Sequence, residues 1–373
     1  MRILIDINHP AHVHYFRNLI KIMIEKGHEF VVVNRDDKMI NQLLDYYQID
    51  HIIRNKRPEK KNSFKSLCYL LGCICACIKA SFKYKPNIYL GFGSSAASIT
   101  ALLFRKPCII LDDTEHNKLN HRLYLPGASV VLTPFYYNID LGEKQLRFNA
   151  YVEQLYMHSH YFTKNETTIN EQGVKSDEYV LVRYIAYDAH HDKDVKPLCE
   201  EQKKAIIQLL AQKYRVLLSM EKNNQDEFYK PYLVHFSPEK MHDIEAGAKF
   251  LVAEGATMAS EAFVNGVPYV YLNPLHVGYI DQQQQAMPQY FFQTTDYQEA
   301  INAINHLTSM PVDKDSIKAS IEASTIDPTL FLVWFVENFP TSLQQTREQQ
   351  DSAIFGNNLS NTIYFCSNGF HSC

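Results

Sequence analysis

Residues Glu254–Glu261 (EGATMASE) lie between an apolar run and a helical pattern, and their types suit a phosphate ligand. Gly255 allows a close turn, and the free N–H groups and positive dipole end of the following helix attract a phosphate. Glu261 falls one turn into that helix, where a carboxylate can accept hydrogen bonds from ribose hydroxyls. The alternative is an ordinary helix N-terminus that Thr257 or Ser260 caps.

A second candidate site is the histidine-containing loop Asn8–His14 (NHPAHVH), which follows the apolar run Arg2–Ile7. Histidine titrates near neutral pH, so His9 or His12 can serve as a general base or as a phosphate partner. The alternative is a loop that caps a helix and packs one imidazole in the core. No third ligand is fixed by the spacing, so we expect no metal site here.

Two shorter polar segments also come directly after apolar runs. Gly91–Ser95 (GFGSS) is half of a phosphate loop, and a tight turn is the simpler interpretation. Asp112–His116 (DDTEH) places three acids and a histidine together, which is costly unless they have a function; the alternative is a surface turn. Arg183, inside the apolar run Tyr179–Tyr184, can clamp a phosphate.

The elements that position these segments follow an alternating strand and helix pattern. Short apolar runs such as Arg2–Ile7 and Glu29–Asn34 predict buried parallel strands, and the stretches between them carry helical periodicity. The pattern extends over about 150 residues and starts again near residue 178. We therefore predict an α/β protein with two doubly wound, Rossmann-like domains facing across a cleft. Ligands bind such sheets at the carboxyl ends of the strands.

The predicted domains are residues 1–165 and 166–325. Residues 326–340 contain an apolar helix (TLFLVWFVEN), and the polar, aperiodic residues 341–373 are expected to be mostly disordered.

Composition excludes several classes. The chain has 373 residues, with 37 Lys and Arg against 41 Asp and Glu, so no global positive field indicates nucleic acid. Apolar residues make up 46% and charged residues 21%, which excludes a wholly disordered chain. No run of about 18 apolar residues and no leader pattern stands out, so we expect no membrane span and a cytoplasmic protein with reduced cysteines.

One stretch suggests a surface for lipid. Residues 54–65 carry six Lys and Arg and a single acid, and an apolar helix follows over about 66–82. Basic residues beside an apolar helix can dock on anionic lipid, so residues 54–82 predict peripheral association with the cytoplasmic membrane face. The alternative is a solvated loop before a core helix.

Several segments together resemble a known group of proteins. MRILIDINHPAHVHYF, GFGSSAA, LDDTEHNKLNHRLYLP, HDIEAGAKFLVAEGATMASEAFVNGVPYVYLN and TLFLVWFVEN lie in order over about residues 1–340. They resemble a prokaryotic family of unknown function that is similar to the GT-B superfamily. That superfamily includes nucleotide-sugar glycosyltransferases and UDP-N-acetylglucosamine 2-epimerases.

The resemblance implies a nucleotide-sugar donor on the C-terminal domain. Gly255, Ala256 and Thr257 match the loop that meets the diphosphate, and Glu261 matches the glutamate that meets the ribose. The acceptor side and the catalytic base belong to the N-terminal domain. The residues that match its strand ends are His9, His12, Gly93, Ser94, Glu115 and His116.

The resemblance further implies that the helix near 326–338 crosses back to the first domain, and that neither a metal nor a cofactor is required. Our leading hypothesis is a glycosyltransferase that makes cell-surface polysaccharide or glycolipid, using a sugar or lipid-linked acceptor and His12 or Glu115 as base. A UDP-N-acetylglucosamine 2-epimerase or hydrolase, with Asp112, Glu115 and His116 moving the proton, is the second. A non-catalytic nucleotide-sugar or glycan binding protein is the third.

Overall fold

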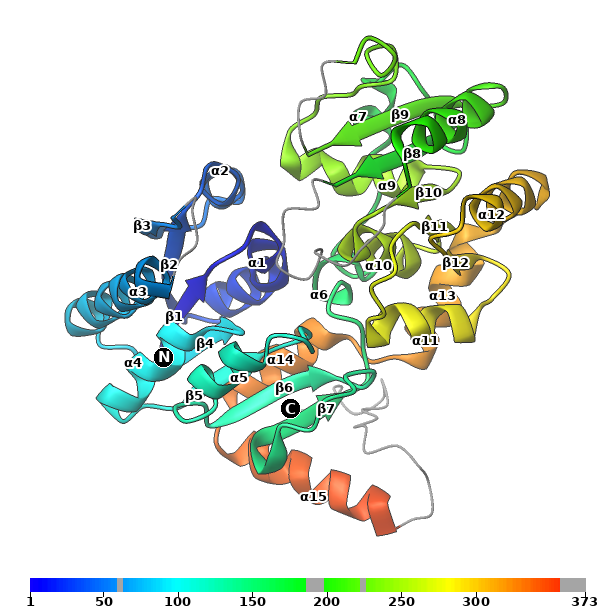
Figure 1. Cartoon of the computed structure of the whole chain (residues 1–373). Helices are drawn as coiled ribbons and strands as arrows, with labels where there is room; N and C mark the ends of the chain where they lie inside the picture. The colour runs from blue at the N-terminus through cyan, green and yellow to red at the C-terminus, as the bar shows by residue number, and fades with distance from the viewer. Residues whose placement is uncertain (59–62, 186–197, 222–225, 356–373) are drawn as a thin grey trace. The chain divides into compact units, whose positions relative to one another are not determined.

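The computed structural model describes residues 1–58, 63–185, 198–221 and 226–355, and it divides into two compact units (Figure 1). The first unit contains residues 1–156 and the chain from Thr325 onward, and the second contains residues 157–324. The division after Tyr156 falls earlier than the sequence suggested. The reason is local packing: Tyr151 and Tyr156 are buried, with their rings against Tyr136 and Tyr15 of the first unit.

A seven-stranded parallel sheet organises the first unit, in the order β3-β2-β1-β4-β5-β6-β7. Helices cover both faces of such a sheet, so β1 is apolar on both sides, and Ile3, Leu4, Ile5 and Ile7 have no exposed surface. The strand order reverses between β1 and β4. The strands are β1 Arg2–Ile7, β2 Glu29–Asp36, β3 His51–Lys56, β4 Ile88–Phe92, β5 Cys108–Leu111, β6 Val130–Pro134 and β7 Gln145–Phe148.

The helices of the first unit connect these strands, and two more come from the end of the chain. The connecting helices are α1 Pro10–Glu25, α2 Lys38–Tyr46, α3 Ser63–Tyr84, α4 Ser95–Phe104 and α5 Lys118–Tyr124, with a 3₁₀ turn at Gly142–Lys144. Helix α6, Gln154–Met157, follows β7 and contains the division after Tyr156. Helix α14 (Pro328–Glu337) packs on α1, and Glu337 pairs with Lys26 at 2.6 Å. Thr329 Oγ1 donates to the Leu155 carbonyl at 2.8 Å. The late apolar helix is thus part of the first unit.

The expectation of a disordered tail from residue 341 is wrong for its first part. Residues Thr341–Phe355 form helix α15, which contacts α14. The hydroxyls of Ser342 and Thr346 are buried and donate to the carbonyls of Phe335 and Ser342, so polar side chains here satisfy backbone oxygens. This explains why apolar periodicity did not reveal the helix. Residues 356–373 lie outside the described part of the chain.

The second unit is built on a five-stranded parallel sheet, in the order β12-β11-β10-β8-β9. Its strand order reverses between β8 and β10, and Val180, Val182, Val252, Val270 and Leu218 form part of its core. The strands are β8 Tyr179–Tyr184, β9 Arg215–Met220, β10 Leu251–Ala253, β11 Tyr269–Tyr271 and β12 Phe291–Gln293. The helices are α7 Glu166–Asn170, α8 Glu200–Ala211, α9 Met241–Gly247, α10 Ala256–Val264, α11 Gly278–Ala286, α12 Tyr297–Ser309 and α13 Lys314–Ser324, with a 3₁₀ turn at Pro238–Lys240.

Each unit is therefore a doubly wound parallel α/β sheet, which confirms the predicted fold class. In each, the strand order reverses beside a loop that the sequence marked as a candidate site: Asn8–His14 and Gly91–Ser95 in the first unit, and Glu254–Glu261 in the second.

Candidate functional site

The switch point of the first unit is organised by a buried acid that sequence reasoning missed. Asp6, near the end of β1, is fully buried and accepts hydrogen bonds from Ser94 Oγ at 2.6 Å and Asn8 Nδ2 at 2.8 Å. Arg54 Nε, on β3, donates to the other carboxylate oxygen at 3.0 Å, and Arg54 also donates to Asn8 Oδ1. This network links β1 and β3 to the N-cap of α4 and to Asn8, the first residue of the histidine-containing loop. The only signal in the sequence was an acid inside the apolar run RILIDI.

His9 is the N-cap of α1, and its Nδ1 accepts from the Ala11 N–H at 3.2 Å. His12 lies one turn further, half-buried, with its ring 5.0 Å from that of Phe92 at the end of β4. The structure thus brings the loop after β1 and the end of β4 together, as the predicted topology requires. The alternative of a capping loop with one packed imidazole is also present, because His9 caps the helix and His14 is buried, with its ring 5.4 Å from that of Tyr156.

The environment of His12 holds it in one protonation state. Burial, His9 and Arg35 lower the pKa of His12 well below its usual value, so the ring is neutral near pH 7. Its Nδ1 accepts a hydrogen bond from the Asn8 N–H at 3.4 Å. A neutral imidazole that accepts at Nδ1 carries its proton on Nε2. His12 is therefore arranged to donate a hydrogen bond through Nε2 rather than to remove a proton with it.

Gly93 and Ser94 shape the loop after β4. Gly93 has a φ of +51°, in the left-handed region, and its carbonyl accepts from Asn120 Nδ2 at 2.7 Å. Ser94 is the N-cap of α4: its Oγ accepts from the Ala97 N–H at 3.1 Å while donating to Asp6. Ser94 is also fully buried. Its hydroxyl is occupied within the protein, which fits a positioning role rather than the expected contact with substrate.

The acidic loop after β5 lies beside Gly93, since a Cβ on that glycine would be 3.8 Å from Asp112 Oδ1. Asp112 is buried and accepts from Tyr124 Oη at 2.6 Å and from the Thr114 N–H at 2.9 Å, while His121 Nε2 lies 3.5 Å from its Oδ2. Burial raises the pKa of Asp112. The sequence named Asp112 but not Tyr124 or His121.

Asp113, in the same loop, has a pKa within the operating range of an enzyme. Burial, together with the charges of Asp112 and Glu115, raises the pKa of Asp113 to about 7. Glu115 is half-buried and accepts from the Asn138 N–H at 2.8 Å, and His116 is exposed. A carboxyl group with such a pKa can exchange a proton in either direction, which makes Asp113 an acid–base candidate that the sequence did not single out.

The switch point of the second unit contains the start of α10. Gly255 is the N-cap and provides no side-chain hydrogen bond to the first turn, while Ala256 is half-buried and Thr257 is exposed. Neither residue of the capping alternative caps the helix: the cap position belongs to Gly255, and buried Ser260 instead accepts from Gln283 Nε2 at 2.9 Å. The first-turn N–H groups of α10 thus end without a side-chain cap, which suits an anion.

Glu254, just before this loop, ties it to the neighbouring strand. Its carboxylate is fully buried, lies 2.6 Å from Lys203 Nζ and accepts from the Ile185 N–H at 2.9 Å. The carbonyl of Glu254 accepts from Asn273 Nδ2, after β11, at 3.0 Å. The start of α10 is therefore held from both sides.

Two predicted ligand contacts of this unit are placed differently from the expectation. Arg183 directs its guanidinium to β9, donating to Ser219 Oγ at 2.7 Å and Glu221 Oε1 at 3.1 Å. Glu261 is buried, with Oε1 3.3 Å from His242 Nε2 on α9. Both side chains thus contact other parts of their own unit, whereas Gly255, Ala256 and Thr257 stay together at the helix start.

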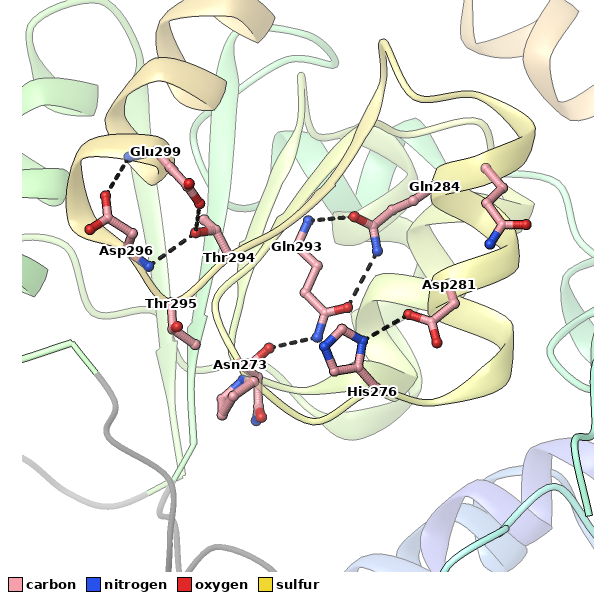
Figure 2. Close-up of a pocket in the computed structure, with 11 residues that line it drawn as sticks. Asn273, His276, Asp281, Gln284, Gln293, Thr294, Thr295, Asp296 and Glu299 are labelled. Atoms are coloured by element: carbon pink, nitrogen blue, oxygen red, sulfur yellow. Dashed lines mark hydrogen bonds and ion pairs between the residues drawn. The ribbon is translucent and has the colours of Figure 1, made fainter.

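A pocket of about 540 Å³ opens at the carboxyl ends of β11 and β12 (Figure 2). In it, His276 Nδ1 lies 3.0 Å from Asp281 Oδ1, Gln293 Nε2 donates to the Asn273 carbonyl at 2.8 Å, and Thr294 Oγ1 donates to Glu299. Amides, carboxylates and a hydroxyl are the groups that bind sugar hydroxyls. Because Asn273 lines the pocket and donates to Glu254, the pocket adjoins the start of α10. The sequence did not mark this region as a site.

Comparisons with known proteins place the chain in a family. Residues 1–333 match the model of the family described as "Protein of unknown function (DUF354)". The chain belongs to the DUF354 family. A relative, the uncharacterized protein MJ0665 of Methanocaldococcus jannaschii, is 21% identical over 314 residues, which cover 80% of this chain and 89% of the relative. The expected membership in a family of unknown function is confirmed.

Similarity to solved structures shows the wider fold group of this DUF354 protein. MnaA of S. aureus, solved with UDP, aligns with a TM-score of 0.65 at 13% identity, covering 91% of this chain and 97% of that one. The UDP-GlcNAc 2-epimerase of Neisseria meningitidis, bound to UDP-GlcNAc, aligns at 0.62 and 13% identity over 91% and 100% of the chains. The glycotransferase of kitacinnamycin aligns with a TM-score of 0.60 at 12% identity, covering 90% of this chain and 98% of that one. The DUF354 chain therefore has the GT-B type of fold.

Proposed function

We propose that this protein is a nucleotide-sugar enzyme, and specifically a glycosyltransferase of cell-surface polysaccharide or glycolipid synthesis. One observation carries the proposal: the start of α10, without a side-chain cap, adjoins a pocket lined by sugar-binding groups through the Asn273–Glu254 hydrogen bond. A helix start that attracts a diphosphate, next to groups that bind hydroxyls, matches the two halves of a nucleotide sugar. The UDP and UDP-GlcNAc in the similar structures support this ligand class.

In this proposal the donor diphosphate binds at Gly255, Ala256 and Thr257, and the sugar occupies the pocket beside Asp281. Stabilisation of the departing diphosphate comes from the N–H groups and dipole of α10, so no metal or cofactor is needed. Glu261 is proposed to contact the ribose, and its buried carboxylate also contacts His242. Arg183 takes part only if its guanidinium leaves Ser219 and Glu221, because both hold it toward β9.

The acid–base chemistry is proposed to come from the switch point of the first unit. Asp113, with its pKa near 7, is the base that takes the proton of an acceptor hydroxyl, with Glu115 as its neighbour in the same loop. His12 donates a hydrogen bond through Nε2, with the His9 ring 5.9 Å from its own, and exposed His116 supplies a further polar group in the loop of Asp113. Gly93 and Ser94 hold the loop geometry. The acceptor is a sugar or a lipid-linked sugar, and the reaction takes place in the cytoplasm.

A 2-epimerase is the second candidate, and the cluster of Asp112, Asp113 and Glu115 favours it. Such a reaction removes a proton from the sugar and returns one, and neighbouring carboxyl groups with different environments can share that work.

The donor site is tested by thermal unfolding of the full chain with UDP- and GDP-sugars. A ligand at about 100 times its Kd stabilises the folded state by about 2.7 kcal/mol. Thr257→Glu adds a negative charge in the first turn of α10, which itself favours the helix but opposes a diphosphate. We expect Thr257→Glu to lose the increase in unfolding temperature that the ligand causes. Thr257→Gln, whose side chain has the same shape as Glu but no charge, should keep it. Equal shifts in both variants would reject the phosphate site.

The reaction class is tested with the nucleotide sugar that binds, incubated in D₂O. A glycosyltransferase releases the nucleotide only when an acceptor is added and leaves the carbon-bound hydrogens of the sugar unlabelled. A 2-epimerase incorporates deuterium at C2 without an acceptor, which would favour the second candidate. Saturable binding with neither reaction across an acceptor panel would favour the non-catalytic binding protein.

A further inference from the structure

The outward face of helix α3 is apolar and exposed along its whole length. Phe64, Leu67, Leu71 and Phe82 are 74%, 54%, 51% and 70% exposed, and Cys68 and Cys75 lie on the same exposed stripe. Phe64, Cys68, Leu71, Cys75 and Phe82 follow one another at intervals of three, four or seven residues, so they line one side of the helix. A contiguous apolar stripe of this length is unusual on a surface that faces only water.

The apolar face continues onto α4, which lies beside α3 in Figure 1. Leu102 and Leu103, at the end of α4, are 55% and 62% exposed. The rings of Phe82 and Phe104 are in contact at 5.1 Å and join the two helices. We call the exposed residues of α3 together with Leu102 and Leu103 the α3–α4 face.

The charges on the α3–α4 face are all of one sign. Neither α3 nor α4 contains an Asp or a Glu. Lys65, Lys79 and Lys83 are exposed on α3, and exposed Arg105 and Lys106 follow α4 directly. An apolar stripe flanked by basic residues complements a bilayer, with apolar contacts in the interface and positive charge against anionic headgroups.

The packing of α3 argues against its crossing a membrane. By length and composition the helix could span a membrane, with a mean hydropathy of 1.4, which the search for uninterrupted apolar runs did not reveal. However, its inner face belongs to the core: Cys73, Cys77 and Ala80 are buried, and Tyr89 Oη donates to buried Ser81 at 2.7 Å. Leaving the sheet would expose that face.

The basic stretch that first suggested lipid contributes less than expected. Arg54, counted there among the solvated cations, is buried against Asp6, and residues 59–62 lie outside the described part of the chain.

We propose that the α3–α4 face is a docking surface for an anionic lipid bilayer. A second copy of the chain is the other conceivable occupant, but a two-fold interface would place the same lysines against one another. The headgroups of anionic lipid would instead neutralise the positive charges of these lysines. This inference stands on the exposed residues of α3 and α4 alone and does not depend on the proposed function.

The test is flotation of the full-length protein with vesicles of phosphatidylcholine, with and without 30% phosphatidylglycerol. We expect binding to the anionic vesicles that weakens at high salt. Phe64→Ser with Leu71→Ser should reduce the bound fraction at least ten-fold. The matched control is Ile24→Ser with Tyr46→Ser, which removes two comparably exposed apolar side chains from α1 and α2 and should leave binding unchanged. Equal binding of both pairs of variants would overturn the proposal.

A second measurement locates the contact. An environment-sensitive fluorophore on Cys75 should shift to shorter wavelength when anionic vesicles are added, whereas one on exposed Cys199, in the second unit, should not. Vesicle-independent dimerisation that Phe64→Ser with Leu71→Ser abolishes, seen by analytical ultracentrifugation, would assign the face to a second copy and also overturn the proposal.

Discussion

Arg54 Nε donates to Asp6 Oδ1 at 3.0 Å, and neither side chain has any exposed surface. The pair lies under the loop that holds His9 and His12, and both partners also bond to Asn8 at the start of that loop. A buried ion pair of this kind is a weak source of net stability, but it is costly to break. We interpret it as the element that keeps the histidine-containing loop in one conformation.

Arg54→Met should therefore lower the free energy of unfolding by about 3–5 kcal/mol, because it leaves the Asp6 carboxylate buried without its cation. Adding Asp6→Asn to that variant should restore part of the loss, since the neutral amide no longer needs the guanidinium. Urea unfolding of the two single variants and the double variant measures the coupling. Strict additivity of the two losses would show that the pair is not energetically coupled.

Asp113 should give the protein a characteristic pH dependence. Its folded pKa of about 7 is above the unfolded value near 3.9, so between these values the folded state binds more protons than the unfolded state. Stability therefore falls as pH rises from about 4 to 7. Asp113→Asn removes this effect and should raise the free energy of unfolding at pH 8 by about 2 kcal/mol, but not at pH 4.

As the proposed base, Asp113 is active when ionised, so kcat/KM should rise with pH around a midpoint near 7. Asp113→Asn should lower kcat/KM by about 10²–10⁴-fold and flatten the profile. A variant that keeps the wild-type profile would assign the base to another group.

His12 can be examined with two amides that each reproduce one ring nitrogen. Asn replaces Nδ1, which accepts from the Asn8 N–H, whereas Gln places an N–H donor near the position of Nε2. Because we assign His12 a donor role, His12→Gln should retain activity within about ten-fold and His12→Asn should lose about 10²-fold. Comparable losses in both variants would indicate a base. Steady-state kinetics with the nucleotide sugar distinguishes the two results.

The lowered pKa of His12 also has a consequence for stability. The unfolded imidazole binds a proton below about pH 6.5 while the folded one stays neutral, so His12 lowers stability as pH falls below that value. His12→Gln should lessen the decrease in Tm between pH 7 and pH 5. An unchanged decrease would contradict the neutral state assigned to the ring.

The pocket in Figure 2 should bind the sugar rather than the nucleotide. Asp281→Ala removes a carboxylate that faces His276 and can accept from sugar hydroxyls. We expect it to weaken binding of the nucleotide sugar at least ten-fold and of the free nucleotide less than two-fold. Calorimetric titration of both ligands measures this, with Asp315→Ala on α13 as a control outside the pocket. Equally weakened binding of both ligands would show that the pocket does not hold the sugar.

The sequence by itself determined the alternation of strands and helices and the loops at the strand ends. Buried parallel strands are continuous apolar runs, so Arg2–Ile7 and Tyr179–Tyr184 were predictable from composition alone. Strands β7 and β12 were not, because they lie at sheet edges and their residues, QLRF and FFQ, do not form continuous apolar runs. The loops Asn8–His14 and Glu254–Glu261 were found because polar residues and glycine interrupt apolar runs where α/β proteins bind ligands.

Only the tertiary structure decided what each side chain in those loops does. Arg54 is separated from Asp6 by 48 residues, and only the order β3-β2-β1 brings the two together. The partners of Arg183 and Glu261 also come from other elements: Arg183 donates to Ser219 on β9, and Glu261 faces His242 on α9. The pocket also combines residues after β11 and β12 that have no common motif. Local patterning records which residues are buried, whereas the partner of a polar side chain depends on strand order and register, to which distant parts of the chain contribute.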